Sequence, residues 1–177
     1  MHKKLWEASE VIKNTSNLFK YEKFLFNKFN YRPSKNFTKL LDWSINNPKE
    51  FWSSIWDFCR VKGNKNYKFK ISKNLIQNKY LVNSKLNFAE NLLSMNSNSK
   101  AITFISENGY KKVRTWKELK INTFKIIDFF KKIKIQENDR VVAYLPNYIE
   151  TVECFLATSS LGAIWSSCSP DFGVNGV

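Results

Sequence analysis

Residues 139–173 read DRVVAYLPNYIETVECFLATSSLGAIWSSCSPDFG, two apolar runs separated by a helical pattern. The first run, 141–145, is almost continuous, which favours a strand that is covered on both faces of a sheet. Apolar side chains then recur three and four positions apart over 149–156, as on one face of a helix. Gly162 stops that helix, and 163–167 follows as the second strand. The stretch predicts a β-α-β unit, whose crossover we expect to be right-handed.

A hairpin and a long helix are predicted just before this unit. Strands over 101–106 and 111–114 are separated by Glu-Asn-Gly, a turn signal. Thr115 and Glu118 have the spacing of a capping box, in which each side chain accepts a hydrogen bond from the other residue's backbone amide. We expect the helix that they start to run to about Lys132.

The first third of the chain predicts four helices. Residues 5–29 read as two short helices, with Thr15 and Ser16 as candidate caps of the second. A third helix is expected over 37–45, and Asn-Pro-Lys-Glu at 47–50 is a start signal for a fourth. The fourth helix has one broad apolar face, which we expect to pack in a core: Phe51, Trp52, Ile55, Trp56 and Cys59.

The pattern is weaker between these helices and the hairpin. Residues 64–76 alternate polar and apolar side chains, which fits either a strand or an irregular connection. A short helix is predicted over 86–93, and a loop rich in Ser and Asn follows over 94–100. We place a domain boundary in this loop, so that 1–96 form a helical amino-terminal region and 97–177 form the α/β part.

The charge of the chain suggests a polyanionic partner at first sight. Lys and Arg number 29 against 15 Asp and Glu, a formal net charge of +14, which by itself would favour nucleic acid or a membrane surface. However, the lysines are scattered singly among Asn and Ile, and all three residues have A/T-rich codons, so a composition bias explains the excess. Residues 64–79 lack the pattern of an RNA-binding sheet. We therefore expect neither nucleic acid nor a membrane as a partner.

The cysteines and the lengths of the apolar segments indicate the cellular compartment of the protein. The opening MHKKLWEASEVIKN has no apolar segment of signal-peptide length behind it, and no run of about 18 apolar residues occurs. The cysteines, Cys59, Cys154 and Cys168, are odd in number and too far apart for a zinc or redox motif. We expect a soluble, cytoplasmic protein with reduced thiols and no metal site.

No catalytic residue is assigned from the motifs. The five glycines do not form a phosphate-binding loop with a Lys-Ser or Lys-Thr pair. His2 is the only histidine, so a histidine acid or metal site cannot be built. Glu150 and Glu153 are three positions apart on the helix of the β-α-β unit, and we interpret them as part of its wet face.

Small polar residues at 166–169 follow the second strand of the unit. Open α/β sheets bind ligands in the crevice beyond the carboxyl ends of their strands, so these residues are candidates for a binding site. Alternatively, they only make the turn before Pro170. The spacing leaves both interpretations open.

Five segments of the chain have a recognisable order and spacing: KLWE at 4–7, FWSSIWDF at 51–58, LNFAENLL at 86–93, YLPN with ETV at 144–152, and GAIWSSCSPDFG at 162–173. These segments resemble the acetoacetyl-CoA synthetases, which are AMP-forming acyl-CoA ligases. The resemblance extends over essentially the whole chain, and its last run is the most specific.

This resemblance implies a fold and an activity. The fold is α/β, and this chain supplies a helical amino-terminal region and then the first hairpin and β-α-β elements of the large AMP-binding domain. The activity joins acetoacetate and ATP, with Mg²⁺, into acetoacetyl-AMP and pyrophosphate, after which the CoA thiol displaces AMP. The family's phosphate loop, acyl pocket and catalytic Lys come later in sequence, so we expect this chain to be an amino-terminal piece that is inactive alone.

The resemblance also implies one site. Similar acetyl-CoA synthetases have a Gly-Gly turn close to bound CoA, and the matching residues here are Ser169, Pro170, Asp171 and Phe172. Proline has no amide hydrogen, so the backbone contacts of a glycine pair do not carry over whole. Asn83 lies where the family usually has Pro-Gly-Ala, and asparagine can adopt the left-handed conformation of a glycine.

Two alternative functions stay open at this point. One is a sibling ligase that acts on acetate or propionate, because the acyl pocket would decide the acid. The other is a non-enzymatic basic binding module, whose binding would weaken as salt rises.

Overall fold

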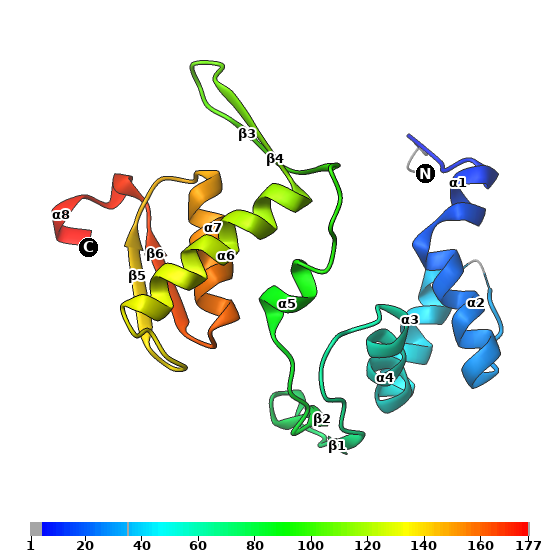
Figure 1. Cartoon of the computed structure of the whole chain (residues 1–177). Helices are drawn as coiled ribbons and strands as arrows, with labels where there is room; N and C mark the ends of the chain where they lie inside the picture. Colours follow the sequence, from blue (N-terminus) through cyan, green and yellow to red (C-terminus); the bar gives the residue numbers. More distant parts are fainter. Residues whose placement is uncertain (1–4, 35, 177) are drawn as a thin grey trace. The chain divides into compact units, whose positions relative to one another are not determined.

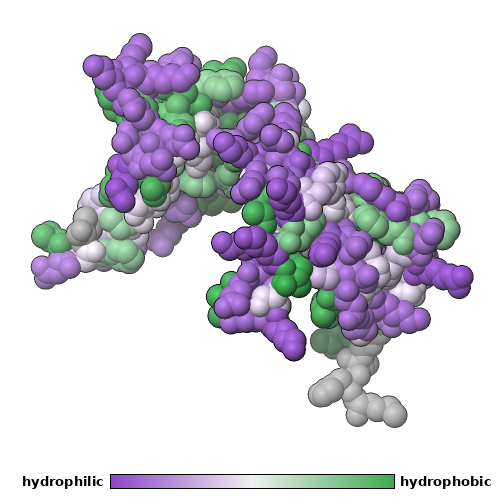
Figure 2. All heavy atoms as spheres, turned by 90° about the horizontal axis from the view of Figure 1, so that it is seen from below, coloured by the Kyte–Doolittle hydropathy of each residue, from purple (hydrophilic) through white to green (hydrophobic). Residues whose placement is uncertain are grey.

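The computed structural model describes residues 5–34 and 36–176. His2 and Lys4 lie outside these residues. The chain forms two compact units that divide between Lys85 and Leu86, and Figure 1 shows the elements of each. Hydrophilic side chains cover most of the face seen in Figure 2, with separate apolar patches between them. Within the described residues, no helix combines the length and the apolar character that a bilayer crossing needs.

The first unit contains the four expected helices and a short antiparallel ribbon. Ser16 caps the second helix, because its Oγ accepts a hydrogen bond from the Phe19 amide at 3.1 Å. The helices are α1 (Glu10–Thr15), α2 (Asn17–Phe29), α3 (Phe37–Asn46) and α4 (Pro48–Phe58). The ribbon consists of β1 (Lys68–Lys70) and β2 (Lys79–Val82), which are joined through the 3-10 turn η1 (Leu75–Gln77).

The core of the first unit lies between α2, α3 and α4. The Tyr21 hydroxyl and the Ser54 hydroxyl are hydrogen bonded at 2.7 Å inside it. Two residues of the expected core face of α4 are not buried: Trp52 is 41% exposed beside Tyr80 of the ribbon, and Cys59 is exposed. That part of the prediction is wrong, because the ribbon covers Trp52 only partly and Cys59 lies just beyond the last residue of α4. The buried apolar residues of the core are Tyr21, Leu25, Tyr31 and Leu40.

The second unit contains the expected hairpin and β-α-β elements. Helix α6 ends at Lys132, as its capping box and periodicity predict. The elements are α5 (Phe88–Leu92), β3 (Lys100–Ile105), β4 (Lys111–Thr115), α6 (Trp116–Lys132), β5 (Arg140–Tyr144), α7 (Ile149–Ser160), β6 (Ile164–Cys168), η2 (Pro170–Phe172) and α8 (Gly173–Gly176). Strands β3 and β4 pair antiparallel, and β5 and β6 pair parallel.

Strands β5 and β6 have one covered face and one open face. Val141 lies opposite Trp165 in the ladder, and both are half-buried, Val141 against α6 and α7 and Trp165 against α7. On the other face Val142 is 72% exposed and Ile164 is 48% exposed. The expectation of a strand covered on both faces is therefore not met, because the helices that pack on β5 and β6 within the described residues lie on one side.

Helix α5 belongs to the second unit. The Asn87 side-chain amide donates to the backbone oxygens of Ser159 at 2.9 Å and Ser160 at 3.2 Å, at the end of α7. The Phe88 ring packs against Phe155 of the same helix, with centroids 5.7 Å apart. These contacts explain why the compact units divide before α5 and not in the loop 94–100. The assignment of 1–96 and 97–177 to separate domains of an enzyme stays a prediction.

Candidate functional site

The carboxyl ends of β5 and β6 lie at the same edge of the sheet, as parallel pairing requires. Tyr144 is opposite Cys168, and the Leu145 amide donates to the Cys168 backbone oxygen at 3.3 Å, just beyond the last ladder position. The chain then leaves β5 through Pro146 and leaves β6 through Ser169. This edge is the position where open α/β sheets bind ligands.

The turn after β6 is held by its own hydrogen bonds. The Ser169 hydroxyl donates to Asp171 Oδ2 at 2.9 Å and accepts the Asp171 amide at 3.4 Å. The Phe172 amide donates to the Ser169 backbone oxygen at 3.2 Å. The Tyr144 hydroxyl donates to the Pro170 backbone oxygen at 2.8 Å, which ties the turn to β5. The four residues that the sequence singles out therefore form one ordered turn, in which Phe172 is 60% exposed.

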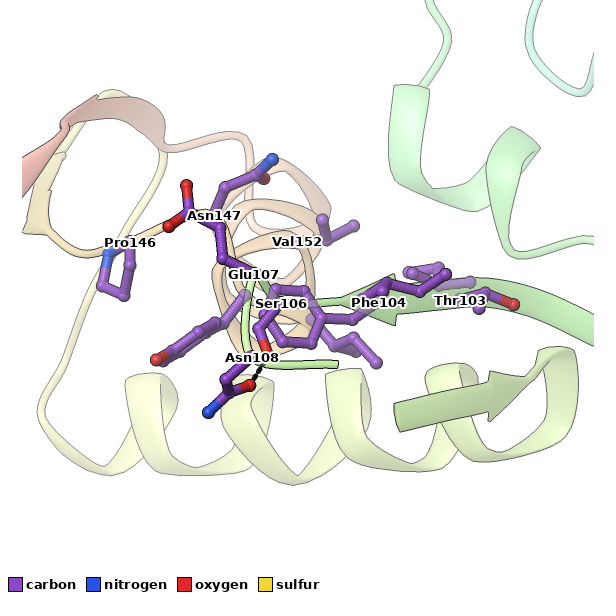
Figure 3. Close-up of a pocket in the computed structure, with 12 residues that line it drawn as sticks. Thr103, Phe104, Ser106, Glu107, Asn108, Pro146, Asn147 and Val152 are labelled. Atoms are coloured by element: carbon purple, nitrogen blue, oxygen red, sulfur yellow. Dashed lines mark hydrogen bonds between the residues drawn. The ribbon is translucent and has the colours of Figure 1, made fainter. Parts of the chain in front are cut away.

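A pocket of about 780 Å³ lies between β3, the hairpin turn and the segment that follows β5. Figure 3 shows Phe104, Ser106, Asn108, Pro146 and Asn147 around it. The ring of Phe104 meets the ring of Tyr148 edge to face, with centroids 5.1 Å apart. The Ser106 hydroxyl donates to the Asn108 side-chain oxygen, which also accepts the Tyr110 amide at 3.1 Å.

The chemistry of this pocket suits binding more than catalysis. Its walls combine aromatic and aliphatic side chains with hydroxyl and amide groups, and Glu107 is the only carboxylate among its described lining residues. Within residues 5–34 and 36–176, no group of three His, Cys, Asp or Glu side chains could hold a metal ion.

Burial raises the pKa of the Cys154 thiol, which disfavours the thiolate and fits an inert cysteine.

An ion-pair network fixes the hairpin on α7. Glu153 is only 3% exposed, and its Oε1 accepts hydrogen bonds from Arg114 Nε and from the Asn122 side chain, both at 2.9 Å. Glu150, nearer solvent, pairs with Lys112, and the hydrogen bond from Lys112 lowers the pKa of Glu150. The interpretation that Glu150 and Glu153 lie on a solvent-exposed face is thus wrong for Glu153, which β4 and α6 cover.

The sequence contained a signal for Glu153 but not for its partners. Glu153 lies four positions after Ile149 and three before Leu156, both of which are buried, so the helical period places all three on one face. Arg114 and Asn122 come from β4 and α6, and nothing in their spacing links them to α7. The contact between Tyr144 and the turn after β6 was likewise invisible, because it depends on the parallel register.

Proteins similar to this chain are found both by sequence and by structure. No protein-family model matches the chain. Over 147 residues it is 40% identical to the acetoacetyl-CoA synthetase of Xenopus tropicalis, a match that covers 80% of this chain and 22% of that protein. Over 174 residues it is 33% identical to the acetoacetyl-coenzyme A synthetase of Rhizobium meliloti (strain 1021), which covers 98% of this chain and 27% of that protein.

The chain is homologous to the acetoacetyl-CoA synthetases over most of its length. It spans about a quarter of the length of the curated relatives that it matches. The solved structure of the acetoacetyl-CoA synthetase from Streptomyces lividans matches 98% of this chain and 28% of that chain, with a TM-score of 0.87 and 21% identity. That likeness confirms the fold class expected from the sequence, a helical amino-terminal region followed by the first hairpin and β-α-β elements of an AMP-forming acetoacetyl-CoA synthetase.

Proposed function

We propose that this chain forms the amino-terminal region of an acetoacetate-CoA ligase. The enzyme joins acetoacetate and ATP into acetoacetyl-AMP and pyrophosphate, and then transfers the acyl group to CoA. The observation that carries the proposal is the 40% identity to a curated acetoacetyl-CoA synthetase over 147 residues. We also propose a cytoplasmic location, which three cysteines without a disulfide support.

The turn after β6 is our proposed contact with coenzyme A. Proline at 170 has no amide hydrogen, and the amides of Asp171 and Phe172 are already bonded to Ser169. Neither of these two amides is free for a phosphate, and the Asp171 carboxylate would repel one. These residues fit the uncharged pantetheine arm instead, against the exposed ring of Phe172.

ATP and Mg²⁺ do not fit the described residues. A triphosphate needs closely approaching amides and a cation, and the glycines of this chain do not form such a loop. A divalent metal needs oxygen ligands, and no suitable cluster lies within the described residues. We propose that both bind the part of the enzyme that corresponds to the remaining length of the relatives.

The test of the function is an assay of the protein encoded by the complete gene. We expect pyrophosphate release that depends on acetoacetate and exceeds the release with acetate or propionate. The 177-residue chain alone should release none, because it contains no phosphate loop. A preference for acetate or propionate would assign a sibling ligase, and no release with any acid would overturn the proposal.

The CoA contact predicts a separate effect in the same enzyme. Phe172→Ala removes the exposed ring, so we expect the KM for CoA to rise by roughly tenfold, the value of one lost apolar contact. Acetoacetate-dependent pyrophosphate release should stay unchanged, because adenylation precedes CoA binding. The matched control is Val174→Ala, which removes a side chain that is 95% exposed just beyond the turn. An unchanged KM for CoA in Phe172→Ala would contradict this contact.

A further inference from the structure

The ribbon of the first unit lies in the most basic stretch of the chain. Between Asp57 and Glu90 the sequence has eight Lys and Arg residues and no Asp or Glu. Lys65 forms an ion pair within the first unit, because its ammonium group donates to Asp57 Oδ1 at 2.5 Å. No carboxylate lies within this stretch to pair with the lysines of the ribbon.

The lysines of the ribbon are gathered on one exposed face. Lys70 of β1 lies directly opposite Lys79 of β2, although like charges at opposed positions repel. Lys68 is two positions before Lys70, and both are exposed while Phe69 between them is half-buried. None of Lys68, Lys70, Lys73 and Lys79 forms an ion pair with any residue in the described part of the chain. A bound anionic surface would relieve this repulsion.

The tip of the ribbon presents two aliphatic side chains to solvent. Leu75 is 80% exposed and Ile76 is 93% exposed, in the 3-10 turn between the two strands. Polar side chains hold the turn from within: Asn74 Oδ1 accepts the Ile76 amide at 3.1 Å, and Asn78 Oδ1 accepts the Ser72 amide at 2.6 Å. Side-chain hydrogen bonds therefore hold the turn while both aliphatic side chains stay exposed.

From this arrangement we propose that the ribbon, residues 68–79, docks on an anionic lipid bilayer. Lysines near such a surface are attracted to its negative potential, and aliphatic side chains insert at the boundary between headgroups and acyl chains. The contact is peripheral and does not involve a spanning helix. It differs from the expectation, based on composition alone, that the chain has no membrane partner.

The exposed tip favours a bilayer over nucleic acid. Proteins that bind single strands without sequence preference combine cations with aromatic rings on which bases stack. Here the apolar side chains at the tip are Leu75 and Ile76, which have no flat face for a base but partition well into lipid. The exposed ring of Tyr67 lies before β1, beneath the ammonium group of Lys65. Nucleic-acid binding is thus the competing outcome of the test.

The experiment measures binding of the 177-residue chain to vesicles by co-sedimentation. We expect binding to vesicles of phosphatidylcholine mixed with phosphatidylserine, little binding to phosphatidylcholine alone, and a loss of binding as salt rises. K70Q/K79Q should weaken binding by roughly tenfold or more, at about 1 kcal/mol for each lysine near the surface. L75S/I76S should weaken it by a similar factor, because the two side chains no longer insert.

Matched variants of the same unit serve as controls. K39Q/K49Q removes the same charge from exposed positions on α3 and α4, and L5S/V11S removes two exposed aliphatic side chains away from the ribbon. Both control pairs should bind nearly as the parent chain does. Circular dichroism of each variant checks that the unit is folded.

Four results would overturn the proposal. One is equal binding to vesicles with and without phosphatidylserine, and another is a control pair that loses as much binding as the ribbon pairs. The third is tighter binding to single-stranded RNA than to anionic vesicles at the same salt. If the ribbon served a contact inside the ligase instead, L75S/I76S would lower ligase activity of the complete protein and leave vesicle binding unchanged, which also overturns it.

Discussion

Glu153 is a buried carboxylate that links three elements of the second unit. Its carboxylate is 3% exposed and accepts hydrogen bonds from a strand residue, Arg114, and a helix residue, Asn122. The hydrogen bond to Glu153 raises the pKa of Arg114, so the arginine stays charged. A buried carboxylate with this much support is stable, whereas the same group without its cation is costly.

Removal of the cation should therefore destabilise the unit strongly. We expect Arg114→Met to lower the free energy of unfolding by about 3 kcal/mol, since it leaves a buried charge without its partner. Urea unfolding followed by circular dichroism measures the change.

Two further variants distinguish the effect of an unpaired buried charge from the effect of losing a side chain. The double variant R114M/E153M should recover most of the lost stability, because it removes both charges and fills their positions with apolar side chains. Lys112→Met, which removes a cation paired with the more exposed Glu150, should cost less than about 1 kcal/mol. A double variant as unstable as Arg114→Met would show that volume and not charge carries the effect.

At the residue scale, the sequence predicts the backbone conformation of single residues better than it predicts the contacts of their side chains. Asn83 has φ of 66°, the left-handed conformation expected where the family has Pro-Gly-Ala, and Gly162 ends α7 with φ of 71°. Both follow from what one side chain permits its own backbone. The network of Glu153 joins three elements and depends on how they pack, so one-dimensional spacing could reveal its buried position but not its partners.

At the scale of the element, α6 shows how a local signal fixes a helix start. The Thr115 hydroxyl accepts the Glu118 amide at 3.2 Å, and Glu118 Oε2 accepts the Thr115 amide at 2.9 Å. The ionised carboxylate accepts the second bond more strongly than the neutral acid would, and this holds the pKa of Glu118 below its usual value of 4.5. This capping box is confirmed as the sequence predicts it.

The capping box predicts a specific pH dependence. Because the pKa of Glu118 is lower in the folded state, its contribution to stability is present above pH 4.5 and is lost as the pH falls through the folded value. The free energy of unfolding should therefore drop in this range more steeply for the parent chain than for Glu118→Gln. Urea unfolding from about pH 6 to pH 3 measures both curves. Parallel curves would contradict a role for the ionised carboxylate.

Elements with strong local signals were predicted to within a residue or two, whereas the ribbon was not. Helices α3 and α6 and both strands of the hairpin were expected nearly where they lie. Residues 64–76 left strand and irregular structure open, because β1 and β2 are short and their pairing is set by partners that are distant in sequence. Composition favours a domain boundary in the loop 94–100, whereas the compact units divide before α5, which packs on α7.

At the scale of the whole molecule, the outer face of β5 and β6 is unusually apolar for a surface. Val142, Tyr144 and Ile164 share this face and are 72%, 51% and 48% exposed. Apolar side chains beside open strand edges favour association with other chains. The chain should therefore associate more readily than a protein of this charge ordinarily would.

Charge on that face should suppress the association. We expect V142K/I164K to scatter less light than the parent chain at the same concentration, because two lysines on the open face repel a second copy. Val174→Lys adds charge at a position that is 95% exposed outside the sheet, and it should have little effect. Equal scattering by all three proteins would contradict association through this face.

The central claim is that this chain serves as the amino-terminal region of an acetoacetate-CoA ligase. The most direct test is a chimera in which the chain replaces the matching 27% of the Rhizobium meliloti enzyme, assayed for acetoacetyl-CoA from acetoacetate, ATP and CoA. We predict acetoacetyl-CoA formation by the chimera and none by the Rhizobium enzyme that lacks this region. A folded chimera that forms no acetoacetyl-CoA, beside an active parent enzyme, would contradict the account.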